Sequence, residues 1–209
     1  RRRQADVAHP NSAHRVADAL RSAVCDASAA RAVLTPCLRP DAATALEWTI
    51  SHLDAPILRT ITTWQGLVEK DGIVISHASP LNPISGYIRT RSRAAAVFKE
   101  TSCSIAFHGH THFPLAFSLD AGIEMPKMLV PDPGGTMHLH FSPQSRYLVN
   151  VGSVGQPRDG IPDACCGIFD SERREFVLHR VPYDWKTSAA KIEAAGLPPF
   201  LAQRLAKGV

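Results

Sequence analysis

A short apolar stretch that runs into two histidines limits the choice of fold more than any other part of this sequence. Residues 104–107 read Ser-Ile-Ala-Phe, typical of a buried strand, and lead through His108 into Gly109-His110-Thr111-His112. Glycine permits the sharp turn that such a strand end requires, and neutral imidazole is a common ligand of transition metals. The pattern predicts a strand that presents His110 and His112 to a metal ion. A solvated histidine-rich loop would have the same sequence.

A β-hairpin with another terminal histidine precedes this strand. Residues 66–70 and 72–77 are rich in apolar side chains and meet at Asp71-Gly72, a pair typical of tight hairpin turns. The second segment is apolar on both faces, which favours a central, buried strand. It ends at His77, another histidine at the carboxyl end of a strand, which could be a metal ligand or a core histidine bonded to the backbone.

The order of these segments predicts a parallel pair of strands. Residues 90–100 favour a helix, and they stand between the strand that ends at His77 and the strand over 104–107. A strand, a helix and a strand in succession form a right-handed crossover. His77 and His110 should then share one edge of the sheet, where open α/β sheets bind their ligands.

Helical periodicity marks both ends of the chain. Residues 12–24 and 41–53 each carry apolar side chains at helical spacing, and Asp41 is the expected N-cap of the second helix. Residues 184–206 return to a helical pattern that is interrupted at 196–199, Gly-Leu-Pro-Pro.

Between these helices lie five further strand-like segments, which we expect to form a second sheet. A loop rich in Pro and Gly, residues 121–135, separates the first two of them, and a glycine-rich loop over 152–160 separates the third and fourth. The pattern as a whole is typical of an α/β protein. The five segments are 115–119, 136–141, 147–151, 166–170 and 175–180.

Composition narrows the classes of protein. With 209 residues and 44% hydrophobic side chains, the chain can build one domain with a sizeable core. A formal net charge of +4 is too small to indicate nucleic-acid binding. No stretch approaches the ~20 apolar residues of a membrane span. The five cysteines are scattered without a CxxC pair, which favours a reducing, cytoplasmic location over disulfides or a zinc ribbon.

Taken together, the motifs resemble those of the calcineurin-like metallophosphoesterases. Within that family the chain looks most similar to the small bacterial branch related to diadenosine-tetraphosphatase and phosphodiesterase-type members. The resemblance covers roughly residues 10–185. The matching segments are 45–49, 75–80, Gly109-His110-Thr111-His112 and 149–158.

The resemblance implies a single metallophosphoesterase-like domain over residues 1–209. Two β-sheets would pack face to face with helices outside, in an αββα arrangement that is incomplete at the amino terminus. Residues 1–64 would be the helical remnant of the first half, 65–183 the sheet core with its metal-site loops, and 184–209 a C-terminal helical segment.

The resemblance also implies a chemistry. Family members hydrolyse phosphoric mono- or diesters with a water activated by two divalent metal ions, Mn, Mg, Fe or Zn, ~3.5–4 Å apart. By motif position His77 and His110 would hold one metal and His112 the other, which makes all three catalytic through the metal. The substrate would be a phosphorylated small molecule, a nucleotide or a phosphoprotein.

Other residues receive supporting roles from the same comparison. Arg158 could bind substrate phosphate through its planar guanidinium, although a structural salt bridge would explain it equally well. Asn150 is expected beside the substrate, where it shapes the glycine-rich loop. His108 is expected to support the metal ligands rather than to be one. Asp26 would orient a catalytic histidine in the family, but here its neighbour is Cys25.

Several family motifs are not intact. The Asp-x-His and Gly-Asp motifs would lie at or before residue 1, which is Arg rather than Met, and Val24 stands where the family has an Asn ligand. We therefore expect a truncated or degenerate member that lacks an amino-terminal segment or associates into an oligomer. Two alternatives remain: a non-catalytic binding or scaffold protein, and a single Zn²⁺ held by the three histidines and a water.

Overall fold

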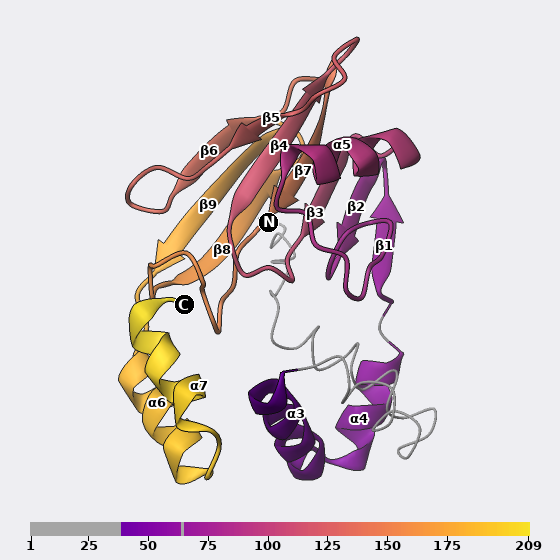
Figure 1. Cartoon of the computed structure of the whole chain (residues 1–209). Coiled ribbons are helices and arrows are strands. Elements are labelled where there is room, and N and C mark those ends of the chain that lie inside the picture. The colour runs from indigo at the N-terminus through magenta and orange to yellow at the C-terminus, as the bar shows by residue number, and fades with distance from the viewer. Residues whose placement is uncertain (1–38, 64) are drawn as a thin grey trace, which may run out of the picture.

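The computed structural model describes residues 39–209 apart from residue 64 (Figure 1). The expected helix over 12–24 lies outside the described residues, as do Val24 and Asp26. The first described helices are α3 (Pro40–His52) and α4 (Ala55–Thr62). No described helix is long and apolar enough to cross a membrane.

Helix α3 begins one residue earlier than its sequence suggests. Its N-cap is Arg39, and Asp41 lies inside the first turn, so the prediction of Asp41 as N-cap is wrong. Pro40 suits the first helical position because its fixed φ matches the helix and it lacks an N–H that would stay unpaired there. Asp41 then places its carboxylate near the positive end of the helix dipole.

The predicted hairpin is confirmed. Strands β1 (Leu67–Lys70) and β2 (Ile73–Ser76) pair antiparallel, and Asp71 and Gly72 both have positive φ, 54° and 74°. The expectation that β2 is buried on both faces is wrong for one of them, because Ile75 is 42% exposed. The core on that face reaches Ile73 at its margin and does not include Ile75.

The predicted crossover is also confirmed. Strand β3 (Ile105–His108) pairs parallel with β2, and helix α5 (Arg91–Glu100) connects them. The helix starts after Thr90, whose hydroxyl oxygen accepts a hydrogen bond from the Arg93 N–H at 3.2 Å. This cap satisfies one of the N–H groups that the first turn leaves without a helical partner.

The later strands are divided between two sheets, which corrects the expectation that they form one. Three of them join the hairpin and β3 in a six-stranded sheet of order β1-β2-β3-β7-β4-β5, and three form a second sheet of order β6-β9-β8. The first group is β4 (Leu115–Asp120), β5 (Lys127–Leu129) and β7 (Ser145–Asn150). The second is β6 (Met137–His140), β8 (Ala164–Asp170) and β9 (Glu175–Val181).

Strand β7 explains this division. It is buried almost throughout and lies parallel to β3, with Asn150 opposite His108. A strand buried on both faces belongs inside a sheet, and here it completes the centre of the larger one. Strand β5 lies within the segment 121–135 that the sequence indicates as a loop. The C-terminal segment forms α6 (Trp185–Ala194), α7 (Pro199–Gln203) and the 3₁₀ helix η2 (Arg204–Lys207).

Alternate residues of the central strands build two cores. Ala106 and Leu148 face α5 and pack with its Val97 and Phe98. Phe107 and Val149 face the other way and pack against the second sheet. The fold is therefore a mixed α/β arrangement of two packed sheets with helices outside, as predicted. In Figure 1 α5 covers the larger sheet, while α6 and α7 lie at one end of the smaller sheet.

Candidate functional site

Two of the predicted ligands meet where β2 and β3 end. The Gly109 N–H donates to the His77 carbonyl at 2.9 Å, which ties the two strand ends together. His77 Nε2 and His110 Nδ1 lie 2.9 Å apart, a hydrogen bond whose direction depends on the tautomers. Both imidazoles are buried. The prediction that parallel strands bring these two histidines to one edge is therefore confirmed.

The turn that carries the histidines has an uncommon backbone. His110 and His112 adopt φ of 65° and 60°, the left-handed region that favours glycine. Such a conformation costs roughly 1–3 kcal/mol per residue and persists where the surroundings impose it. Here the Thr111 N–H donates to the Gly109 carbonyl at 2.7 Å and the Arg158 N–H to the His112 carbonyl at 3.1 Å.

The tautomer of His112 is set by the glycine-rich loop. Its Nδ1 lies 2.7 Å from the carbonyl oxygen of Gln156. A carbonyl can only accept, so Nδ1 carries the hydrogen and the lone pair of the neutral ring is on Nε2. At metal-binding histidines, one ring nitrogen usually donates a hydrogen bond to a backbone carbonyl. The other ring nitrogen then carries the lone pair that can bind the metal.

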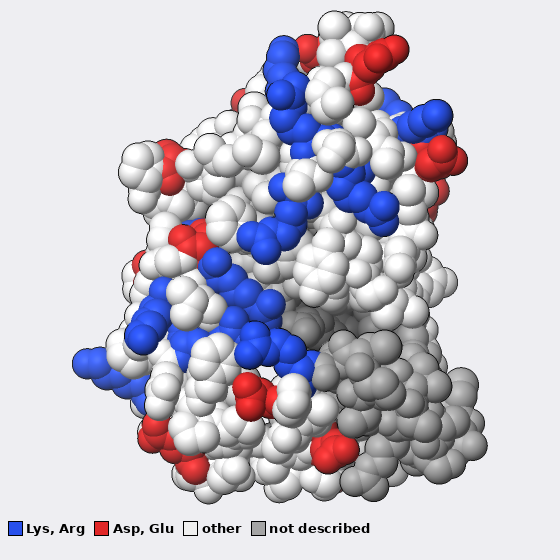
Figure 2. Space-filling model, viewed as in Figure 1, with Lys and Arg blue, Asp and Glu red and all other residues white. Residues whose placement is uncertain are grey.

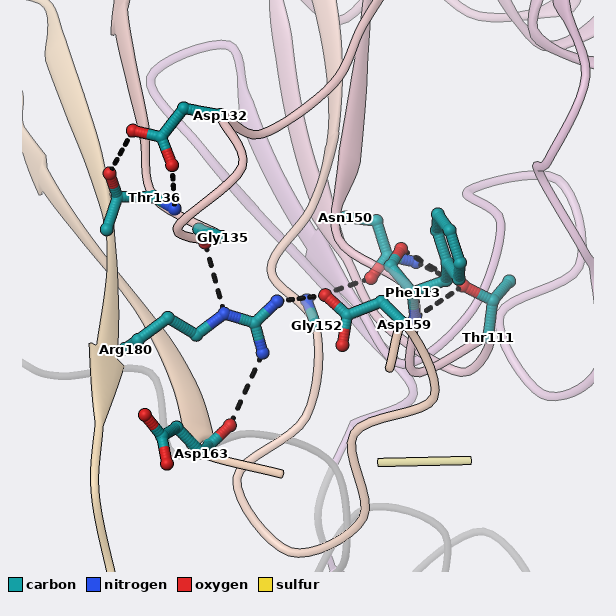
Figure 3. Close-up of polar contacts among 10 residues, drawn as sticks. All are labelled: Thr111, Phe113, Asp132, Gly135, Thr136, Asn150, Gly152, Asp159, Asp163 and Arg180. Carbon is teal, nitrogen blue, oxygen red and sulfur yellow. Dashed lines mark hydrogen bonds and ion pairs between the residues drawn. The ribbon is translucent and has the colours of Figure 1, made fainter. Parts of the chain in front are cut away.

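Asn150 holds the histidine turn in place (Figure 3). Its side chain is fully buried, and its Nδ2 donates to the Gly109 carbonyl at 2.6 Å and to the Thr111 hydroxyl at 3.0 Å. Its Oδ1 accepts from the Gly152 N–H at 3.0 Å. The side chain thus joins the histidine turn to the glycine-rich loop, which is the loop-shaping role expected from the sequence.

His108 is a buried neutral base next to this turn. Burial lowers its pKa to about 4; the backbone hydrogen bond with Gly109 opposes the shift, and the nearby His110 adds to it. Its Nδ1 lies 3.3 Å from Asn150 Nδ2, which can only donate. No described residue makes a hydrogen bond to its Nε2. These contacts suit a supporting residue.

An ion pair that the sequence did not reveal anchors the glycine-rich loop. Arg180 on β9 pairs with Asp159, and their side chains are 5% and 9% exposed. Its Nε donates to the Gly135 carbonyl at 3.1 Å and its Nη1 to the Asp163 carbonyl at 3.3 Å (Figure 3). Nothing in the local pattern around Arg180 distinguishes it from an ordinary surface arginine.

Arg158 lies in the same loop, one residue before Asp159. Its Nη2 donates to the Gln156 side-chain oxygen at 2.9 Å, and it is half-buried. The predicted contact with phosphate and the predicted salt bridge are both still predictions. Its backbone, which reaches His112, places it beside the site.

Two side chains border the turn that sequence reasoning did not connect with it. The ring of Tyr87 lies 4.4 Å from the ring of His110, centroid to centroid. The guanidinium of Arg89 lies 5.3 Å from the ring centroid of Phe113, the residue after His112. Tyr87 carried no sequence signal. Arg89 belongs to a basic run with Arg91 and Arg93, for which the sequence favoured a solvated face, with steering of the substrate as the alternative.

The described residues include side chains of a type that binds metal ions, but too few of them come together to form a complete metal site. His77 and His110 are imidazoles in contact with each other. However, the residues described here contain no group of three or more His, Cys, Asp or Glu side chains arranged to hold a metal ion. The described part of the chain thus brings together two side chains of a type that can bind metal and not a complete set of ligands.

Positive charge gathers on the face shown in Figure 2. Lys and Arg side chains form a band over this face, and Asp and Glu are fewer and more scattered. The chain has a formal net charge of +4. A surface of this sign attracts anionic ligands.

Comparisons with known proteins agree with the fold. A crystal structure of a metallophosphoesterase from Sphaerobacter thermophilus has a TM-score of 0.70 and 33% identity, over 82% of this chain and 69% of that chain. The hypothetical protein PH1004 from Pyrococcus horikoshii OT3 has a TM-score of 0.67 over 92% of this chain and 71% of that one; at 18% identity this shows the fold alone.

One curated relative also matches. The uncharacterized protein MJ0912 of Methanocaldococcus jannaschii is 30% identical over 170 residues, which are 79% of this chain. The chain spans 65% of the length of that relative. No family profile matches the chain.

Proposed function

This chain belongs to the metallophosphoesterase family, and we propose that it hydrolyses phosphoric mono- or diesters with the help of divalent metal ions. The contact between His77 and His110 carries this proposal, because it joins two potential ligands from separate strands at the edge where such folds bind. We place the chain in the small bacterial, phosphodiesterase-related branch and in the cytoplasm. Phosphorylated small molecules, nucleotides and phosphoproteins are the candidate substrates.

In this proposal His77, His110 and His112 hold the metals, which are Mn, Mg, Fe or Zn. Bound ions of this kind lower the pKa of a water and stabilise the oxygens of a phosphoryl group. The protein orients the ligands: the Gln156 carbonyl keeps the lone pair of His112 on Nε2, and Asn150 keeps the turn in its left-handed conformation.

Arg158 would bind the phosphate of the substrate. A guanidinium donates two parallel hydrogen bonds to phosphate oxygens. The Arg158 backbone is bonded to the carbonyl of His112, so its side chain starts next to a proposed metal ligand. The net positive charge of the chain would help to attract an anionic ester.

A non-catalytic binding protein is the second candidate. The observation that favours it is that the described residues contain no group of three or more metal-binding side chains. Function depends on the site rather than on the fold, so a relative can keep these two sheets without the chemistry. Such a protein would purify with less than one metal ion per chain.

Hydrolysis of bis-p-nitrophenyl phosphate in the presence of Mn²⁺, together with metal analysis of the purified protein, tests the proposal. We expect turnover that depends on metal and falls at least about a hundredfold in His110→Ala, because that change removes a ligand of the catalytic metal. His140→Ala, at an exposed position on β6, is the control and should keep full activity. No turnover at any metal concentration would favour the non-catalytic protein.

A further inference from the structure

The segment between β2 and α5 is rigid where it passes the histidines. The Ser79 N–H donates to the Gly86 carbonyl at 3.1 Å, and the Gly86 N–H donates to the Asn82 carbonyl at 3.0 Å. A Cβ on Gly86 would lie 2.6 Å from the Cβ of Ser79, so the loop is closed tightly on itself. On the other side Ile88 is fully buried. The residues on both sides of Tyr87 are thus held in place.

Tyr87 has one side against the site and much of its surface in solvent. Its ring lies 4.4 Å from that of His110 at an interplanar angle of 52°, yet the residue is 52% exposed. An aromatic ring in this position offers apolar surface to a ligand next to a proposed metal ligand. Planar rings stack on such surfaces with little dependence on their substituents.

Arg89 presents a positive charge near Phe113, three residues after His110 in the chain. It is exposed, and its guanidinium lies over the ring of Phe113 at 5.3 Å. This contact holds the side chain over the histidine turn. Ile88 between them is fully buried, whereas Tyr87 and Arg89 are both exposed. A ring at His110 and a charge at Phe113 therefore both border the histidine turn.

We propose that Tyr87 and Arg89 form a selective rim that favours phosphate esters whose alcohol carries a planar aromatic ring. Tyr87 stacks on the ring, as in an aryl or nucleoside ester, and Arg89 binds the phosphate. The rim selects substrates only if the protein is a phosphoesterase, so the inference rests on the proposed function. The binding preference itself can be measured without turnover.

Three probes separate the two residues. Adenosine 5′-monophosphate carries ring and phosphate, adenosine carries the ring alone, and glycerol 3-phosphate carries the phosphate alone. Dissociation constants from ligand-observed NMR should rise about 5- to 100-fold in Tyr87→Leu for both ring-bearing probes, the range that loss of one stacked base produces. For glycerol 3-phosphate the constant should stay within about twofold. Tyr87→Phe keeps the flat face and should resemble the wild type.

Arg89→Met should give the complementary pattern. It should weaken the binding of adenosine 5′-monophosphate and of glycerol 3-phosphate and leave the binding of adenosine unchanged, because only the phosphate contact is removed. Ile84→Ala is the control, since Ile84 is exposed on the same loop and has no assigned role. Thermal unfolding of each variant should match the wild type, which ensures that a loss of binding reports the side chain.

Turnover supplies a second readout. For bis-p-nitrophenyl phosphate, whose alcohol is aromatic, Tyr87→Leu should raise KM with kcat within about twofold, as loss of uniform binding does. Equal weakening of all three probes, or no binding of adenosine by the wild type, would overturn the rim. If the protein hydrolyses esters but does not prefer those with an aromatic ring, the rim is rejected and the phosphoesterase proposal stands. If the protein prefers ring-bearing ligands through Tyr87 but shows no metal-dependent turnover, the phosphoesterase proposal is rejected and the rim stands.

Discussion

Arg180 and Asp159 form an ion pair almost completely shielded from solvent, and it joins the second sheet to the loop beside the histidines. The same guanidinium bonds two backbone carbonyls, those of Gly135 and Asp163. The residue before Asp159 donates its N–H to the His112 carbonyl, so an arginine 21 residues further along the chain than Asp159 helps to hold the loop that contacts a proposed metal ligand.

Arg180→Met should therefore destabilise the protein strongly. It leaves the Asp159 carboxylate buried without its partner, which costs about 3–5 kcal/mol in free energy of unfolding. Chemical denaturation measures this loss. The double variant Arg180→Met, Asp159→Leu should recover a large part of it, because no buried charge is then left alone.

The exposed pair of Arg173 and Asp170 gives the control. Their side chains are 76% and 47% exposed, and surface pairs contribute about 0–1 kcal/mol. If Arg173→Ala and Arg180→Met lowered the unfolding free energy equally, the anchoring role of Arg180 would be wrong.

Gly152 should not tolerate alanine. Its φ is 74°, and an added Cβ would lie 2.7 Å from the Cys165 Sγ and 2.9 Å from the Cys165 Cβ. The left-handed backbone costs a residue with a Cβ roughly 1–2 kcal/mol, and overpacking adds about 1–3 kcal/mol. We expect Gly152→Ala to lower the free energy of unfolding by the sum of both.

Gly160 separates these two contributions. Its φ is 87°, but nothing lies within 4 Å of an added Cβ. Gly160→Ala should therefore show only the backbone cost, about 1–2 kcal/mol. If urea denaturation showed the same loss of unfolding free energy for both variants, the close contact with Cys165 would add no cost of its own.

Cys165 should resist alkylation in the folded protein. Burial raises the pKa of its thiol to about 12, with the charge of Arg180 opposing the shift, so almost no thiolate is present at pH 8. The adjacent Cys166 is only partly buried and should react much faster with iodoacetamide. Peptide mass spectrometry distinguishes the two sites, and both should label equally once the chain is unfolded in urea.

The sequence was most informative where the physics is local. The hairpin at Asp71-Gly72 follows from turn chemistry, and the meeting of His77 and His110 follows from one crossover rule applied to two strands. Both predictions used residues close to the elements that they described.

The sequence failed where pairing between distant segments decides the outcome. The apolar run of residues 147–151 identifies β7 as a strand, but it does not show that this strand pairs with β3 rather than with β6. Likewise Tyr87 reaches His110, and Arg180 reaches Asp159, only after the sheets have formed. Contacts of this kind depend on sheet order and register, which local patterns do not encode.

His108 should make stability depend on pH in a narrow range. Its pKa falls from 6.5 to about 4 on folding because burial disfavours the charged ring. Between these values the unfolded chain binds a proton that the folded protein does not, so the free energy of unfolding should decrease as the pH falls from 6.5 to 4. A shift of this size corresponds to roughly 3 kcal/mol, present in full above pH 6.5 and lost below pH 4.

Urea denaturation across this range should show a clearly shallower pH dependence in His108→Phe than in the wild type. His138→Phe on the exposed face of β6 should keep the wild-type slope, and identical slopes in all three proteins would mean that His108 is charged in the folded state.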